Sequence, residues 1–177
     1  MLYIFDLDST LVKLYDTEPL PGVHSGLDVL KREGHALAIA TNQAGPAWRM
    51  ETGDEKFPEA TSLGRRFREI AGLIPLLEKV PWFVSLYDDR LSLDQRSYDT
   101  LVRDFEFSGG RLELHISADP SWRKPRPGML LAACRRYGLS IAQAVFVGDA
   151  ETDAEAALAA GMGFIFEDEF FDHRTAI

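Results

Sequence analysis

Apolar and polar residues alternate along the chain in blocks whose lengths separate strands from helices. Short continuous apolar runs are typical of strands that a parallel sheet buries on both faces. Five segments have this character: LYIF (2–5), HALAIATNQ (35–43), WFVSLY (82–87), AVFVGD (144–149) and GMGFIF (161–166). We expect each of them to be a strand.

The segments between these runs have the composition and spacing of helices. Leu63, Phe67 and Ile70 recur at intervals of three and four, as on one face of a helix. Helices are predicted over 19–34, from about 59 to 75, over 126–138 and, Ala-rich, over 151–161. Strands that alternate with helices predict a parallel sheet covered on both faces, a three-layer α/β/α domain. With no repeat and no linker in the sequence, residues 1–177 are expected to form one domain.

Residues 88–122 interrupt this alternation. They contain a predicted short helix, a Gly109-Gly110 turn and the alternating stretch RLELHIS. We interpret them as a small insertion that forms a flap over the strand ends and contributes to specificity. No long segment separates the first two predicted strands except a loop and one helix, so no large cap domain is expected.

Composition narrows the class of protein. The chain has 177 residues, 46% of them hydrophobic, and a formal net charge of -9, which argues against a nucleic-acid groove. The single Cys134 excludes an intramolecular disulfide and a Cys-based zinc cluster. The N-terminus lacks a basic signal-peptide region, and no apolar stretch approaches the roughly 20 residues of a membrane span. A cytoplasmic protein without a membrane partner is expected.

Polar residues collect where the predicted strands end. Ligands of open α/β sheets bind outside the carboxyl ends of the strands. Carboxylates there supply the hard oxygen ligands that Mg²⁺ prefers, and further carboxylates can act as nucleophile and general acid. Lysine, hydroxyl and amide groups supply donors for an oxyanion such as phosphate. The residues at these positions are Asp6, Asp8, Thr10, Thr41, Asn42, Lys124, Asp149 and Asp153.

Four motifs in this order carry a resemblance to a known family. FDLDST, TNQ, RKPRPGM and VGDAETD resemble the motifs of haloacid dehalogenase-like phosphohydrolases. The stretch PLPGVHSGLDVLKREGHALAIATNQAG is similar to the subgroup (subfamily III) that contains histidinol-phosphatase and heptose-bisphosphate phosphatase. The likeness covers residues 2–166 apart from the insertion, and it implies a Rossmann-like fold.

The resemblance implies an activity and a division of roles. Asp6 would be the nucleophile that forms an aspartyl-phosphate, and Asp8 the general acid and then base. Asp6 and Asp149 would bind Mg²⁺ through their side chains and Asp8 through its backbone carbonyl, with Asp153 supporting the metal from behind. The implied function is a Mg²⁺-dependent phosphomonoester hydrolase that acts on a small phosphorylated metabolite.

The same resemblance implies a binding site for the phosphoryl group. Thr41 and the Asn42 backbone amide would hold its oxygens, and Lys124 would neutralise the crowded negative charge. Thr10 and Arg123 are added to the predicted substrate-binding residues. Arg123 could hold a second substrate anion together with Arg126, or both could simply face solvent.

The chain departs from the subgroup in the loop that usually carries Cys and His ligands for zinc. The sequence there reads YDDR and DPSWRKP, so no structural zinc is expected. Asp88, Asp89, Asp119 and His115 are interpreted as solvated loop residues rather than an alternative metal site. Ser9 stands where glycine is common, and Ala150 where Lys or Arg is frequent.

Some alternatives remain open at this level. Arg65, Arg66 and Arg68 are interpreted as the solvated face of a helix, and Trp48 and Trp122 as packing residues. A non-catalytic phosphoacceptor module, with Asp88 or Asp89 as the acceptor, is a rival function from another class. A nucleic-acid 3′-phosphatase is a third, disfavoured by the acidic charge balance.

Overall fold

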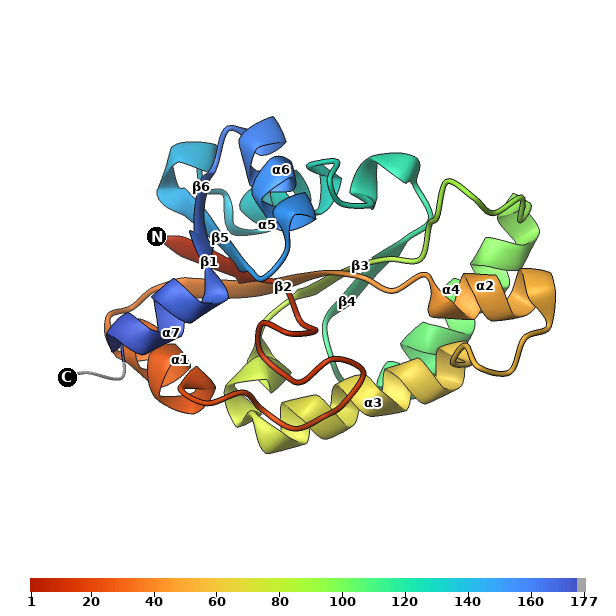
Figure 1. The fold of residues 1–177 in the computed structure, drawn as a ribbon, viewed down its shortest axis with the longest axis horizontal. Coiled ribbons are helices and arrows are strands. Elements are labelled where there is room, and N and C mark those ends of the chain that lie inside the picture. The colour runs from red at the N-terminus through yellow and green to blue at the C-terminus, as the bar shows by residue number, and fades with distance from the viewer. Residues whose placement is uncertain (175–177) are drawn as a thin grey trace.

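A six-stranded, wholly parallel sheet forms the middle layer of the protein (Figure 1). The structure, a computed structural model, describes residues 1–174 and the side chains of residues 1–171. The strand order is β4-β3-β2-β1-β5-β6. The bounds are β1 (Leu2–Phe5), β2 (Ala36–Asn42), β3 (Trp82–Ser85), β4 (Leu114–Ser117), β5 (Ala144–Gly148) and β6 (Gly163–Phe166).

Helices cover both faces of the sheet, which confirms the predicted three-layer α/β/α class (Figure 1). One face carries α5 (Gly128–Tyr137) and α6 (Glu151–Ala160). The other carries α1 (Val23–Arg32), α3 (Ala60–Leu73), α4 (Gln95–Gly109) and α7 (Glu167–Arg174). Helix α2 (Gly45–Thr52) follows β2 and lies at the end of the molecule far from α7. Short 3-10 helices span Pro75–Lys79, Pro120–Trp122 and Ile141–Gln143.

The central position of β1 determines where a ligand can bind. All four residues of β1 are buried, and Leu2 pairs with Ala36 on one side and Ala144 on the other. The chain builds β2, β3 and β4 outward in one direction and β5 and β6 in the other. The sheet therefore has its topological switch point between β1 and β5, and the crevice there is the general ligand position of open α/β sheets.

The structure corrects the prediction of a small flap over residues 88–122. Helix α4 packs along α3 in the helical layer, and β4 continues the sheet beside β3, with Leu114 paired to Trp82. The alternation is thus not interrupted, because β3, α4 and β4 form a further strand-helix-strand unit. Two loops remain at the carboxyl edge: residues 86–94, which connect β3 to α4, and residues 118–123, which follow β4.

Among the described α-helices, α2 and α7 are the two that the hydrophobic pattern did not indicate. Both have only eight residues. The predicted strands and the remaining α-helices are confirmed, with ends that shift by a few residues. In the described part of the chain, no helix is long and apolar enough to cross a lipid bilayer.

Candidate active site

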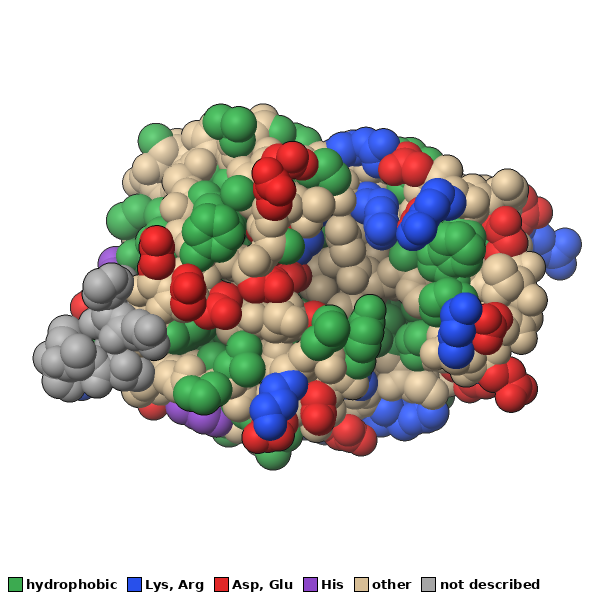
Figure 2. All heavy atoms as spheres, viewed as in Figure 1, with side chains coloured by type: hydrophobic (Ala, Val, Ile, Leu, Met, Phe, Trp, Pro, Cys, Tyr) green, Lys and Arg blue, Asp and Glu red, His purple; other side chains and the backbone are tan. Residues whose placement is uncertain are grey.

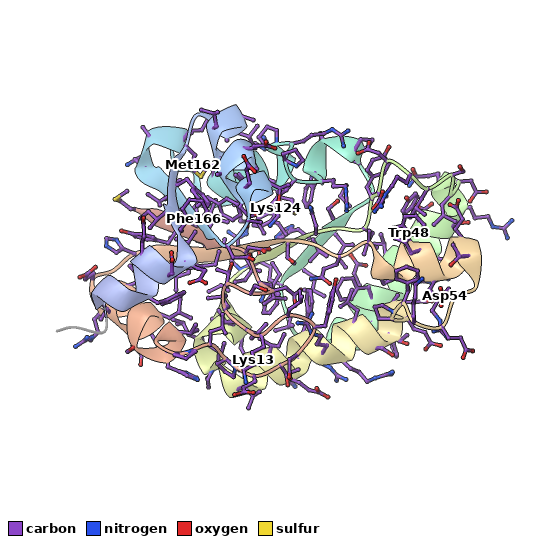
Figure 3. All side chains as sticks on the ribbon, viewed as in Figure 1. Lys13, Trp48, Asp54, Lys124, Met162 and Phe166 are labelled. Carbon is purple, nitrogen blue, oxygen red and sulfur yellow. The ribbon has the colours of Figure 1, made fainter. Side chains whose placement is uncertain are left out.

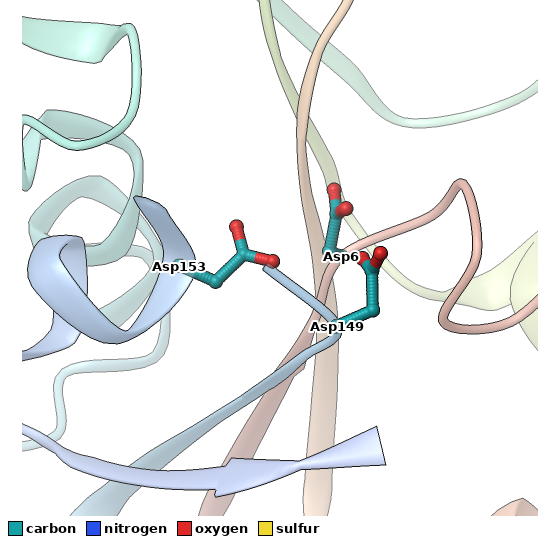
Figure 4. A group of neighbouring side chains, drawn as sticks. All are labelled: Asp6, Asp149 and Asp153. Carbon is teal, nitrogen blue, oxygen red and sulfur yellow. The ribbon is translucent and has the colours of Figure 1, made fainter. Parts of the chain in front are cut away.

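Three carboxylates converge at the switch point of the sheet (Figure 4). Asp6 follows β1 directly, Asp149 follows β5, and these neighbouring strands pair Phe5 with Val147. Asp153 follows Asp149 closely in the chain and lies in the first turn of α6. A side chain at Gly148 would bring its Cβ within 2.7 Å of the Cβ of Asp153. Glycine at this position is therefore what lets Asp153 reach the cluster.

Lys124 supplies the positive charge inside this cluster. Its Nζ atom lies 2.8 Å from Asp6 Oδ1 and 2.6 Å from Asp153 Oδ1, and the side chain is 3% exposed. Asn42 holds the Lys124 backbone from both sides: its Oδ1 accepts from the Lys124 amide at 3.1 Å, and its Nδ2 donates to the Lys124 carbonyl at 3.2 Å. Figure 3 shows Lys124 toward the middle of the molecule, while Trp48 lies on α2.

The electrostatics of the cluster follow from burial and from an excess of negative charge. Burial raises the pKa of Asp6 to about 6, with a contribution from the charge of Asp153, although Lys124 acts in the opposite direction. Burial and Asp153 also raise the pKa of Asp149. Burial disfavours the ammonium of Lys124, but the two carboxylates outweigh it and raise the pKa of Lys124. One ammonium thus faces three carboxylates, and a further cation would relieve the repulsion between them.

The donor set of the cluster fits a hard divalent cation. One carboxylate oxygen from each of Asp6, Asp149 and Asp153 lies within 4.8 Å of the others. The buried Thr10 hydroxyl donates to Asp149 Oδ1 at 3.3 Å, so it orients this carboxylate. An all-oxygen set of this kind suits Mg²⁺. Three or more Asp, Glu, His or Cys residues must lie close together to hold one metal ion. Among the described side chains, Asp6, Asp149 and Asp153 are the group that meets this condition.

Asp8 lies outside that group, and its carboxylate is held by a separate set of donors. Oδ1 accepts from the Tyr15 backbone amide at 3.0 Å, and Oδ2 accepts from Gln43 Nε2 at 2.8 Å. Arg66 makes an ion pair with both oxygens. The intervening Ser9 has a φ of 60°, in the left-handed region that favours glycine, which gives a physical reason for glycine at this position in related motifs.

Arg66 corrects the interpretation of the three arginines on α3. Arg65 and Arg68 are exposed, as expected, but the Arg66 side chain is only 15% exposed and contacts Asp8. The spacing of residues along α3 could have indicated that Arg66 is partly buried. Arg66 lies three residues after Leu63 and four before Ile70, at the border of the buried face.

Gln43 links Asp8 to the predicted phosphate-binding hydroxyl. Its Nε2 donates to Thr41 Oγ1 at 3.0 Å as well as to Asp8. Thr41 is 1% exposed and lies at the end of β2. Because its oxygen accepts from Gln43, the Thr41 hydroxyl keeps its own hydrogen for a ligand oxygen.

Asp88 is not the solvated loop residue that was predicted. It is 2% exposed, and it binds Arg90, Arg123 and the Trp48 indole N–H. The hydrogen bonds from Arg90 are the main reason that the pKa of Asp88 lies well below its usual range. A carboxylate committed to these partners is unsuited to be a free phosphoacceptor. Arg123 also donates to the Tyr87 carbonyl at 2.9 Å, so much of its guanidinium is used within the protein.

Asp89 and Asp119 are exposed loop residues, as predicted, whereas His115 is not a loop residue: it lies in β4 and is half-buried. Asp89 is exposed and pairs with Arg126, while Asp119 caps the 3-10 helix Pro120–Trp122. His115 stacks on Phe83. Lys and Arg side chains gather on one side of the recess in this face of the molecule, and Asp and Glu side chains on the other (Figure 2).

The sequence of the chain is similar to those of known phosphatases. The sequence model described as haloacid dehalogenase (HAD) hydrolase-like matches residues 121–166. D-glycero-beta-D-manno-heptose-1,7-bisphosphate 7-phosphatase of Escherichia coli K12 is 34% identical over 146 residues, which are 82% of this chain and 63% of that protein. The D-glycero-D-manno-heptose-1,7-bisphosphate 7-phosphatase of Thermosynechococcus vestitus is 28% identical over 163 residues, covering 90% of this chain and 71% of that one.

Solved structures show the same fold. A HAD-like phosphatase from Mesorhizobium loti superposes with a TM-score of 0.62 at 21% identity, over 90% of this chain and 68% of that one. D,D-heptose 1,7-bisphosphate phosphatase from B. bronchiseptica, complexed with magnesium and phosphate, gives 0.50 at 19%, over 92% and 78%. The chain belongs to the haloacid dehalogenase-like phosphatases. The curated relatives that it resembles above are heptose-1,7-bisphosphate 7-phosphatases.

Proposed function

We propose that the chain hydrolyses phosphate monoesters of small metabolites, with Asp6 as the nucleophile and Mg²⁺ as the cofactor. The observation that carries this proposal is the placement of Asp6. It is a buried carboxylate at the end of the central strand, paired with Lys124 and flanked by Asp149 and Asp153. Phosphoryl transfer depends mainly on positioning and on charge stabilisation, which this arrangement supplies.

The side chains of Asp6 and Asp149 and the backbone carbonyl of Asp8 are proposed to hold Mg²⁺, with Asp153 behind them. Bound there, the ion would neutralise charge on the phosphoryl oxygens and on the crowded carboxylates. Lys124, the Thr41 hydroxyl and the Asn42 backbone amide are proposed to bind the phosphoryl group.

The reaction then proceeds in two displacements. A carboxylate oxygen of Asp6 bonds to phosphorus while the bond from phosphorus to the alcohol oxygen breaks, and Asp8 gives its proton to that oxygen. Water next attacks the phosphorus of the aspartyl-phosphate, which releases Asp6 and inorganic phosphate, and Asp8 takes the proton from the water. Asp8 thus loses a proton in the first step and regains one in the second, so the full cycle restores its protonated form.

A phosphorylated sugar is the substrate class that we propose. The support comes from the relatives, which are named as heptose-bisphosphate 7-phosphatases. The chain spans 63% to 71% of the length of these two relatives, so its substrate need not be theirs. A net charge of -9 disfavours a nucleic-acid substrate.

The proposal is tested by turnover of p-nitrophenyl phosphate and of a panel of sugar phosphates, with Mg²⁺ or with EDTA. We expect activity that EDTA removes and that Asp6→Asn lowers on the order of 10⁴-fold or more, as for other nucleophile substitutions. Asp28→Asn, an exposed change on α1, is the matched control and should retain activity. Full activity of the Asp6→Asn protein would end the proposal.

A further inference from the structure

Arg66 connects three segments that are distant in sequence. It comes from α3, and its guanidinium contacts both carboxylate oxygens of Asp8, with Nη1 3.3 Å from Oδ2. The same guanidinium donates to the Asp16 carbonyl through Nε at 3.0 Å and Nη2 at 2.7 Å. One side chain thus holds the carboxylate after β1 and the loop of residues 13–18 against the same helix.

This ion pair differs from an ordinary surface salt bridge. The side chains of Arg66 and Asp8 are 15% and 14% exposed, so water screens them poorly. The arrangement also uses both carboxylate oxygens, the geometry in which arginine is most specific. Isolated exposed pairs contribute little, whereas a shielded, two-point pair fixes the orientation of its carboxylate.

The surroundings of Asp8 are built around the orientation that Arg66 imposes. Each oxygen accepts one further hydrogen bond, Oδ1 from the Tyr15 amide and Oδ2 from Gln43. Tyr15 has a φ of 58°, a left-handed conformation that is strained for a non-glycine residue. The residue with the strained backbone is thus the one whose amide donates to Asp8.

We infer that Arg66 is a positioning residue for Asp8 in the acid-base steps of the reaction. The inference rests on the proposed function, and it extends that function to a side chain that acts through Asp8. Arg66 fixes the carboxylate of Asp8 relative to the loop of residues 13–18 and, through Gln43, relative to Thr41. Loss of this order misplaces the proton donor without removing the nucleophile.

The leaving group of the substrate provides the test. An alkoxide is a poor leaving group and needs a proton from Asp8, whereas p-nitrophenolate leaves without one. We expect Arg66→Ala to lower kcat/KM for an alkyl phosphate by about 10²-fold, the scale of a misplaced catalytic group. For p-nitrophenyl phosphate the decrease should stay within about threefold, because its first step needs no proton donor.

Two matched variants complete the experiment. Arg66→Lys keeps the positive charge but loses the planar guanidinium that contacts both oxygens of Asp8. Its kcat/KM for the alkyl phosphate should therefore lie between those of Arg66→Ala and the wild type. Arg65→Ala, on the exposed face one residue earlier, should leave both substrates unchanged. Equal losses of kcat/KM for the two substrates in Arg66→Ala would overturn the inference, as that pattern indicates a general structural role.

A second readout keeps the inference separate from the activity. Hydrogen exchange of the Tyr15 amide, measured on the metal-free protein, should be faster in Arg66→Ala than in the wild type or Arg65→Ala. Unchanged exchange would contradict the positioning role even if turnover fell. If the wild type hydrolysed neither ester, the proposed function would fail, and the exchange result would still decide whether Arg66 orders Asp8 and its loop.

Discussion

At the scale of single residues, the raised pKa of Asp6 makes metal binding depend on pH. The pKa of Asp6 is about 6, above its ordinary value of 3.8, because burial disfavours the ionised carboxylate. Metal binding needs that ionised form, so protons compete with the cation below about pH 6. Between pH 7 and pH 5 we expect the affinity for Mg²⁺ to fall by about tenfold from this group alone. Titration calorimetry at several pH values measures it.

The same shift has the opposite consequence for the metal-free fold. A carboxyl group that holds its proton more tightly when folded stabilises the fold at low pH, and this contribution is lost as the pH rises from about 3.8 to about 6. Asp6→Asn should therefore flatten this part of the stability profile in denaturant titrations with EDTA. A metal affinity that did not change between pH 5 and pH 7 would contradict the assignment of Asp6 as a ligand.

The residues that could be predicted are those whose position follows from a strand. Asp6, Thr41 and Asp149 come directly after buried apolar runs, and the parallel sheet then brings them to one edge. Arg66 and Asp88 could not be placed in this way, because their roles depend on packing between segments far apart in the chain. An arginine at the border of a helical face can turn either to solvent or to a carboxylate, and only the neighbouring loop decides.

At the scale of the elements, Gly64 sets the distance between α3 and α4. A Cβ at this position would lie 2.8 Å from the Phe105 carbonyl oxygen and 2.9 Å from the Gly109 amide nitrogen. Both are backbone atoms of α4, which cannot move without moving the helix. We expect Gly64→Ala to lower the free energy of unfolding by about 1–3 kcal/mol, as measured by urea denaturation.

Gly72 on the same helix is the matched control. Nothing lies within 4 Å of a Cβ built there, and the residue is exposed. Gly72→Ala should therefore stabilise the protein by about 0.5–1 kcal/mol, because alanine favours the helix. If both substitutions had the same sign, the close approach of α3 and α4 would not be the limiting contact.

The elements themselves were predictable where their period is strong. The buried strands are short apolar runs, and α3 has a regular stripe that ends before Pro75. A helix in the α4 region was expected. The strand beside which β4 would lie was not, because the alternating segment RLELHIS does not reveal which strand it will pair with. The pairing of β4 with β3 is a contact across about 30 residues, and local periodicity contains no information about it.

At the scale of the whole molecule, residues 88–122 belong to the core rather than to a removable flap. Phe105 is fully buried and contacts the Phe67 ring with centroids 5.1 Å apart, and β4 covers the outer edge of β3. Replacing 88–122 by a short Gly-Ser linker should therefore abolish cooperative unfolding, seen as a loss of the calorimetric transition.

A substitution within this segment provides the control. Phe107 lies on the outer side of α4 and is 88% exposed, so Phe107→Ser should change stability by less than about 0.5 kcal/mol. A linker variant that still unfolded cooperatively would show that the sheet is complete without β4.

The ammonium of Lys124 acts as a resident counter-ion for the acidic pocket. Its contacts with Asp6 and Asp153 hold two of the three acidic side chains in place before any ion arrives from solution. Removal of Mg²⁺ by a chelator would then abolish activity and leave the fold intact. Activity would return when Mg²⁺ is added back, without a refolding step.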